Sequence, residues 1–140
     1  MSETTATPER PVGPADPSTE EWWTATSEGR LTVQRCNGCG HAQLYPRALC
    51  TACESTDLEL VDAAGTATVH SCTVVHRAPH PYFDPPYVVA LVRLTEGPTL
   101  MTNVVGCDPA DVHIDQAVRV VWEDLPDGRR LPLFTPAEES

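Results

Sequence analysis

The chain has 140 residues, which allows one ordinary domain or a small domain beside a miniature one. It carries 9 basic residues, all of them arginine, against 20 acidic residues, and its net charge is −11 at pH 7. This charge argues against nucleic-acid binding, because such binding depends on neutralising phosphates. No apolar run approaches the roughly 18 to 20 residues that span a bilayer, and residues 1–5 lack a secretion signal. A cytoplasmic protein without membrane contact is therefore expected.

The N-terminal region divides into a tail and a short helix. Residues 1–17 hold four of the fourteen prolines together with Ser, Thr, Glu and Asp, which predicts a disordered tail. Ser18 and Glu21 have the spacing of a capping box, so a helix is expected to start there. The helix is too short to be stable alone, so Trp22 and Trp23 are expected to be buried. They are predicted to pack either against the chain's own β-domain or against a partner protein.

The strongest motif is a pair of Cys-x-x-Cys sequences separated by ten residues. The four cysteines are Cys36, Cys39, Cys50 and Cys53. Two turns with this spacing are typical of a zinc ribbon, in which four thiolates hold one tetrahedral ion. Reduced cytosolic thiols also favour a metal over disulfides. Because four thiolates complete the coordination of zinc, the ion is expected to be structural.

Other residues near this motif offer weaker interpretations. The same four thiolates bind a rubredoxin-like iron for electron transfer, but the sequence contains no flavin or second-cluster motif. His41 follows the first cysteine pair and is expected to face solvent, since four thiolates are already in register. Cys72 and Cys107 are expected to be small buried apolar side chains.

From residue 58 onward the apolar pattern predicts strands and no long helix. The expected strands are residues 66–75, 87–94, 99–105 and 118–123, and a last one around Leu131 and Leu133. The alternation of the first strand slips near His70 and Ser71, which indicates a bulge. The second strand is almost continuously apolar, so both its faces are expected to be covered. A Pro-Asp-Gly turn at residues 126–128 joins the last two strands. Five such strands predict a Greek-key barrel of the OB type.

The sequence thus predicts a mainly β protein with a short N-terminal helix, a rubredoxin-like zinc ribbon and a five-stranded OB-fold barrel. The expected regions are a tail at 1–17, the helix and a lead-in strand at 18–33, the ribbon at 34–57 and the OB-fold domain at 58–136.

The link between the first two barrel strands is rich in functional side chains. It carries four prolines together with His76, Arg77, His80, Tyr82, Phe83 and Tyr87. We interpret it as a stiff loop that presents rings and an arginine to a partner or ligand. One alternative is a loop that packs on its own barrel. A metal site at His76 and His80 lacks further ligands. A catalytic site with either histidine as base and Asp84 as its orienting group lacks a nucleophile.

Taken in order, these motifs resemble a known family. The chain contains Glu-Trp-Trp, Leu-Thr-Val-Gln-Arg-Cys, Cys-Asn-Gly-Cys-Gly-His, Tyr-Pro-Arg-Ala-Leu-Cys-Thr-Ala-Cys, Gly-Thr-Ala-Thr-Val and Pro-Tyr-Val-Val-Ala-Leu-Val. Over residues 18–135 it resembles the rubredoxin-like zinc-ribbon plus OB-fold proteins that accompany acyl-CoA enzymes. One departure is visible at residues 114–118, where the family commonly has a glycine-containing turn.

The resemblance implies a non-catalytic subunit that binds and completes a thiolase-like or lipid-transfer-protein-like enzyme. Such partners include acyltransferases and the aldolases that cleave steroid side-chain CoA thioesters, and related domains occur fused to hydratases. By resemblance, the four cysteines are the zinc ligands, and the two tryptophans and the aromatic loop are candidate contacts with the partner or with acyl-CoA. The alternative is an OB-fold module for single-stranded nucleic acid, with Arg77, Tyr82 and Phe83 as its local patch.

Overall fold

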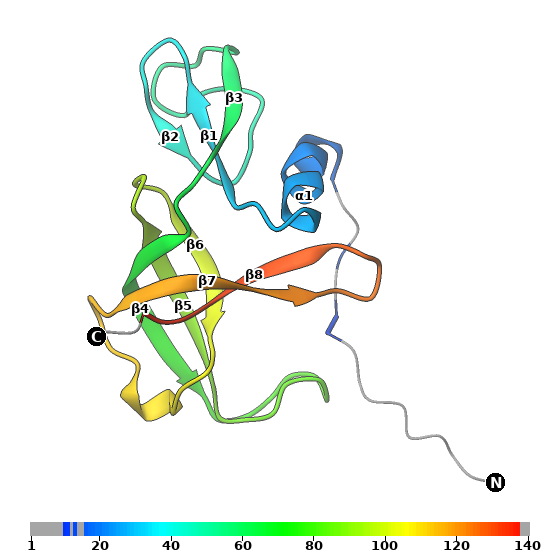
Figure 1. Cartoon of the computed structure of the whole chain (residues 1–140), viewed down its shortest axis with the longest axis vertical. Coiled ribbons are helices and arrows are strands. Elements are labelled where there is room, and N and C mark those ends of the chain that lie inside the picture. The colour runs from blue at the N-terminus through cyan, green and yellow to red at the C-terminus, as the bar shows by residue number, and fades with distance from the viewer. Residues whose placement is uncertain (1–9, 12, 14–15, 138–140) are drawn as a thin grey trace, which may run out of the picture.

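The computed structural model describes residues 10, 11, 13 and 16–137. A three-stranded sheet lies above a closed barrel, and one helix lies beside the junction of the two (Figure 1). None of the helices in the described part of the chain has the length and apolar character needed to cross a membrane. Most of the predicted tail, at residues 1–9, 12, 14 and 15, lies outside the described residues.

The N-terminal helix starts at a different residue and with a different cap from those predicted. Helix α1 (Glu20–Ser27) follows a 3-10 turn, η1 (Pro17–Thr19). The capping box predicted from residues 18 and 21 is wrong, because Thr19 occupies the N-cap position of α1 and makes no side-chain cap. Instead, the carboxylate of Asp16 accepts the backbone N–H of Ser18 at 2.9 Å. An acidic cap followed by proline is a common start for a helical turn, because proline fixes the backbone of the first residue.

Trp22 packs helix α1 against the rest of the chain. Its side chain is 5% exposed and packs in the main apolar core, and its Nε1 donates to the carbonyl of Thr32 at 3.1 Å. Trp23 lies edge-on to it at 4.9 Å and is half-buried, with the Arg129 guanidinium 4.6 Å from its ring. The chain's own core therefore accounts for the burial of Trp22.

The upper sheet is antiparallel in the order β2-β1-β3. Its strands are β1 (Thr32–Cys36), β2 (Ala42–Gln43) and β3 (Leu58–Asp62). Strand β3 pairs along the whole of β1, so the residues that follow position 58 complete this sheet before the chain enters the barrel. The pairing of Cys36 with Leu58 brings the two ends of the cysteine-rich segment together.

The lower unit confirms the predicted five-stranded OB-fold barrel. Its strands are β4 (Thr66–Val75), β5 (Tyr87–Leu94), β6 (Thr99–Val104), β7 (Ala117–Asp124) and β8 (Arg130–Pro136). They close in the order β4-β5-β6-β8-β7. All neighbours are antiparallel except β6 and β8, which are parallel.

The bulge in β4 occurs where the alternation predicts it. The pairing register with β5 shifts between Val69 and Ser71, and His70 is the extra, exposed residue. Val69 is buried before the shift, and Cys72 and Val74 pack against the same core after it. The bulge therefore returns the second half of the strand to the interior. Cys107 likewise is half-buried against this core.

The outer face of β5 is less covered than its apolar sequence predicts. The inward side chains from Val88 to Leu94 are buried in alternation, as expected for a barrel strand. On the outer face Val89 and Leu91 are only half-buried and Arg93 is exposed. The prediction of cover on both faces is therefore wrong for the outer face, which is left as a partly open apolar surface.

The turn before β7 uses Asp115 where glycine is expected. Asp115 adopts a positive φ of 71°. Its N–H donates to the carbonyl of Val69 at 2.8 Å, while the N–H of Val69 donates to the carbonyl of Gln116 at 3.0 Å. Aspartate tolerates this left-handed conformation better than most residues, so the turn forms without glycine.

The barrel closes across a short seam between β6 and β8. One residue pair, Val104 and Phe134, is in parallel register, and the N–H of Val105 donates to the carbonyl of Phe134 at 2.8 Å. Further along, the hydroxyl of Thr102 donates to the carbonyl of Pro132 at 2.9 Å. Proline has no N–H to leave unpaired, which suits a strand edge with so little backbone pairing.

The upper unit contacts the barrel at β6, one of the two strands of this seam. The N–H of Met101 in β6 donates to the hydroxyl of Tyr45, which lies in the loop after β2, at 3.1 Å. Both side chains are exposed, Met101 by 62% and Tyr45 by 45%, and Leu49 of the same loop is exposed by 46%. The two units therefore share a surface that carries large apolar side chains.

Gly106 provides a test of how tightly the seam is packed. It has φ of 79°, and a Cβ there would lie 2.5 Å from Oγ1 of Thr135 on β8. We expect Gly106→Ala to lower the free energy of unfolding by about 2–3 kcal/mol, from backbone strain and crowding together. Gly128 has a similar φ of 94° but open space around it, so Gly128→Ala should cost only about 1 kcal/mol. Denaturant unfolding of the metal-loaded variants measures both free energies of unfolding. Equal losses of stability in the two variants would show that Thr135 does not crowd position 106.

Candidate functional site

The four predicted cysteines come together at the end of the upper sheet. Their sulfur atoms all lie within 4.8 Å of one another. The sulfurs of Cys36 and Cys53 are 3.6 Å apart, and those of Cys39 and Cys50 are 3.7 Å apart. Thiolates bonded at about 2.3 Å to one tetrahedral ion lie about 3.8 Å from one another. The four sulfurs are thus arranged to bind a single metal ion.

Two equivalent turns present these sulfurs. The N–H of Gly38 donates to the sulfur of Cys36, and the N–H of Ala52 donates to the sulfur of Cys50, each at 3.3 Å. Such donors stabilise thiolates, the form that binds metal. Glu54, with φ of 66°, closes the second turn in the left-handed conformation that glycine adopts in the first.

The ionisation of the thiols also fits a metal site. The backbone N–H groups of Cys39 and Gly38 lower the pKa of Cys36 to about 7. The N–H of Ser55 lowers the pKa of Cys53, but the neighbouring thiols of Cys39 and Cys36 outweigh it and raise that pKa to about 12. Four sulfurs this close do not all ionise without a cation among them. A bound metal ion supplies the missing positive charge.

Two buried glutamines position the second cysteine turn. Gln43 donates to the side-chain oxygen of Gln34 at 2.6 Å, and its own oxygen accepts the N–H and hydroxyl of Thr51 at 2.9 and 3.0 Å. Gln34 in turn bonds both the N–H and the carbonyl of Arg47 at 2.9 Å. The sequence interpretation missed both residues, although each lies at an inward position of a short strand. They fix the loop that leads into Cys50.

The rings of the predicted contact loop form one cluster. Phe83 and Tyr87 stack with their centroids 4.9 Å apart, and Tyr82 meets Phe83 edge-on at 5.0 Å. His80 braces them, because its Nδ1 accepts the N–H of Tyr82 and its carbonyl accepts the N–H of Phe83, both at 3.0 Å. The loop is therefore held in one shape by its own contacts.

The other polar residues of the loop differ from His80 in their burial. His76, Arg77 and Asp84 are exposed, whereas His80 is half-buried. Neither histidine belongs to a group of three or more metal-ligand side chains within the described part of the chain. A metal site at His76 and His80 therefore gains no support from the geometry.

Two residues that the sequence interpretation missed complete the cluster. The hydroxyl of Tyr82 donates to the carboxylate of Glu123 on β7, and Nε of Arg10 lies 3.3 Å from the same carboxylate. Burial raises the pKa of the Tyr82 hydroxyl, and its hydrogen bond to Glu123 raises it further. The sequence interpretation placed Arg10 in the tail. No local sequence pattern connects it to Glu123, which lies 113 positions away.

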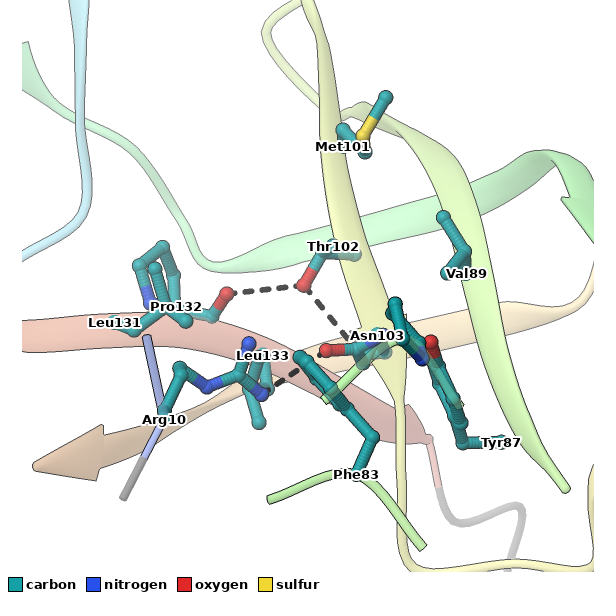
Figure 2. A pocket seen from close by; sticks show the side chains of 11 residues that line it. Arg10, Phe83, Tyr87, Val89, Met101, Thr102, Asn103, Leu131, Pro132 and Leu133 are labelled. Carbon is teal, nitrogen blue, oxygen red and sulfur yellow. Dashed lines mark hydrogen bonds between the residues drawn. The ribbon is translucent and has the colours of Figure 1, made fainter. Parts of the chain in front are cut away.

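A concave surface lies beside this cluster, over β5, β6 and β8 (Figure 2). It encloses a cavity of about 350 Å³. Its apolar walls are Phe83, Tyr87, Val89, Met101, Leu131 and Leu133, and Arg10 forms one side. The partly open face of β5 and the aromatic loop thus belong to one surface.

Comparison with protein-family models finds both units. Residues 23–59 match the model described as "ChsH2, rubredoxin-like zinc ribbon domain". Residues 60–123 match the model described as "ChsH2, C-terminal OB-fold domain". Together the two models cover more than half of the chain and meet within β3.

Two similar proteins differ in how much of their own length this chain covers. The chain is 44% identical over 116 residues to a "Probable enoyl-CoA hydratase alpha subunit" of Thermomonospora curvata, covering 83% of this chain and 36% of that protein. It is 35% identical over 100 residues to a "DUF35 domain-containing scaffold protein" of Methanocaldococcus jannaschii, covering 67% and 71% of the two chains. This chain therefore spans about a third of the hydratase subunit and most of the scaffold protein.

A solved structure is similar along almost the whole chain. It is described as "Ltp2-ChsH2(DUF35) aldolase", and the superposition has a TM-score of 0.83 at 41% sequence identity. The alignment covers 92% of this chain and 100% of the matched chain. Both units of the fold are thus present in the matched chain as a continuous pair.

Replacing one cysteine tests the metal site. We expect Cys36→Ser to lower metal affinity by about 100-fold or more, because one of four thiolates is lost. Cys72→Ser, which changes a half-buried thiol in the barrel, should leave the affinity unchanged. Metal content after dialysis and competition with a chromogenic chelator measure the two. One metal ion per chain in the Cys36→Ser variant at wild-type affinity would contradict the assignment.

The glutamine pair gives a second prediction. We expect Gln43→Ala to weaken metal binding by about tenfold to 100-fold, because the loop before Cys50 loses its support. His41→Ala removes an exposed contact with Thr51 of 3.1 Å and should change the affinity little. The same chelator competition separates the two variants. Equal effects would show that the buried glutamines do not position the turn.

Proposed function

The chain belongs to the ChsH2 family of rubredoxin-like zinc-ribbon and OB-fold proteins, and from this we propose that it is a non-catalytic subunit of a thiolase-like enzyme that acts on acyl-CoA thioesters. The observation that carries the proposal is the full-length similarity to the ChsH2 chain of an aldolase. The partner reaction that fits is a retro-aldol cleavage of a steroid or other side-chain acyl-CoA, or an acyl transfer. In either reaction the partner supplies the catalytic residues.

The proposed metal is zinc, held by Cys36, Cys39, Cys50 and Cys53 in a structural role. Four thiolates fill a tetrahedral ion and leave no position for water or substrate. The match to a zinc-ribbon model supports zinc over iron. An iron site with the same ligands would give a coloured protein, whereas zinc is colourless. Reduced thiols of this kind also support a cytoplasmic location.

The surface proposed for the partner is the one that the aromatic loop shares with the outer face of β5. It combines exposed His76 and Arg77 with the half-buried rings of Tyr82, Phe83 and Tyr87. Aromatic side chains and arginine are enriched in protein interfaces, with apolar groups at the centre and exposed charges at the rim. Trp22 is left out of this surface because it is buried, and Trp23 lines a neighbouring hollow that also includes Arg10 and Leu131.

Single-stranded nucleic acid is the alternative ligand for an OB fold. Its binding requires a basic groove with stacking rings. Here Arg10 is paired with Glu123 and Arg129 with Asp127, so two arginines near the rings are neutralised by acidic side chains, and Arg77 is the exposed arginine of the loop. Together with a net charge of −11, this favours a protein partner. Tight, salt-dependent binding of an oligonucleotide would favour the alternative.

Co-expression with a thiolase-like enzyme of the same organism tests the proposal. We expect the two chains to elute together as a hetero-oligomer, with acyl-CoA cleavage or acyl transfer present only when both are mixed. A monomer that leaves the enzyme's activity unchanged would remove the proposed function. Acyl-CoA turnover by this chain alone would contradict its non-catalytic role.

Charge reversal in the loop tests the proposed surface. We expect Arg77→Glu to raise the dissociation constant of the complex by about tenfold, because an exposed arginine at an interface rim contributes mainly through charge. The matched control is Arg119→Glu on β7, where the arginine is also exposed but lies near the other end of the strand from Glu123. Titration calorimetry measures the dissociation constant of each variant's complex. Equal losses of affinity in the two variants would place the interface elsewhere.

A further inference from the structure

The side chain of Arg10 is inserted into a set of contacts that its sequence region does not suggest. It is 13% exposed. Its Nη2 donates to Oδ1 of Asn103 at 3.1 Å, and its Nε lies 3.3 Å from the Glu123 carboxylate. Its guanidinium carbon lies 5.0 Å from the ring centre of Tyr82 and 5.2 Å from that of Phe83. Figure 2 shows the guanidinium beside Asn103 and Phe83.

We propose that Tyr82, Phe83, Asn103 and Glu123 form a guanidinium-binding site, which the chain fills with its own Arg10 to hold the aromatic loop against the barrel. The proposal concerns a site on this chain alone and does not depend on the identity of a partner enzyme.

The chemistry of the site matches a planar cation. A guanidinium offers N–H donors along its edges and a flat face for aromatic rings. The edges here meet a carboxylate and an amide oxygen, and the guanidinium carbon lies over two rings within the range of a cation–π contact. An ammonium group provides neither the fork of donors nor the stacking face. The preferred ligand is therefore a guanidinium.

Two residues of the site also have contacts of their own that hold them beside the cation. The side-chain Nδ2 of Asn103 donates to the carbonyl of Val88 at 2.8 Å, which turns its oxygen toward Arg10. The carboxylate of Glu123 is held by the hydroxyl of Tyr82. Pre-organised partners of this kind lower the entropic cost of binding.

The position of the site explains how it acts on the loop. Asn103 lies on β6 and Glu123 on β7, the two strands that flank β8 in the barrel. Arg10 therefore crosses the sparsely paired seam and connects it to the loop that carries Tyr82 and Phe83. The guanidinium of Arg129 donates to the carbonyl of Gly13 at 2.7 Å, which anchors the same segment to the β7–β8 hairpin.

Arg10 also lines two hollows of the surface. The cavity of about 350 Å³ and a second one of about 280 Å³ share Arg10, Phe83, Tyr87, Asn103 and Leu133 in their walls. The Arg10 side chain therefore borders both hollows and is the cation paired with the Glu123 carboxylate.

Chemical rescue in the full, metal-loaded chain tests the site. In Arg10→Ala we expect amide exchange at Tyr82 and Phe83 to become about tenfold faster, because the loop loses its ion pair and ring contacts. Addition of methylguanidinium at about 10 mM, a range suited to so small a ligand, should restore slow exchange. Residue-resolved NMR exchange measures both effects.

Three controls make the outcome decisive. Arg30→Ala removes an exposed arginine that is paired with Glu28 and Asp62, and it should leave the loop amides unchanged. Methylammonium at the same ionic strength should not rescue Arg10→Ala, and methylguanidinium should not rescue the double variant Arg10→Ala/Glu123→Gln. Unchanged exchange in Arg10→Ala, or equal rescue by both cations, would overturn the proposal.

Discussion

The fold depends first on four sulfur atoms held close enough to repel one another once ionised. The cysteine-rich segment has two turns and a two-residue strand of its own, too little to form a core. A metal ion among four thiolates contributes folding energy of about 10 kcal/mol in comparable sites. The buried glutamines give the second turn its shape, but their hydrogen bonds do not offset thiolate repulsion. We therefore expect the ribbon to draw much of its stability from the proposed ion.

The barrel also depends on contacts from segments outside its own strands. Strands β6 and β8 share little backbone pairing, and the side of β6 that faces the ribbon is completed by the hydroxyl of Tyr45. On the other side of the seam, Arg10 connects Asn103 with Glu123. Two segments outside the barrel thus supply contacts that backbone pairing supplies elsewhere in it. The loop that carries Tyr45 and the side chain of Arg10 therefore stabilise the barrel in addition to its own core.

The parts that the sequence predicts are those with a local signal. Cysteine spacing locates the metal site, apolar runs and alternation locate the five barrel strands, and a slip in the alternation locates the bulge at His70. The sequence did not reveal Gln34, Gln43, Arg10 or Glu123, because their partners are fixed only after the chain folds. The capping box failed for another reason. Asp16 followed by Pro17 offers a competing start one turn earlier, and the chain uses it.

The arrangement also separates what the ribbon does from what the loop does. A metal with four thiolate ligands has no open position, so its effect on function is transmitted through shape. The shape it maintains includes the loop after β2, whose Tyr45 meets Met101 at the edge of the apolar surface. Arg10 maintains the opposite edge through Tyr82 and Phe83. One surface, bounded by the loop beside the cysteine site and by the loop that Arg10 contacts, fits the proposed role of a subunit that presents a rigid face to an enzyme.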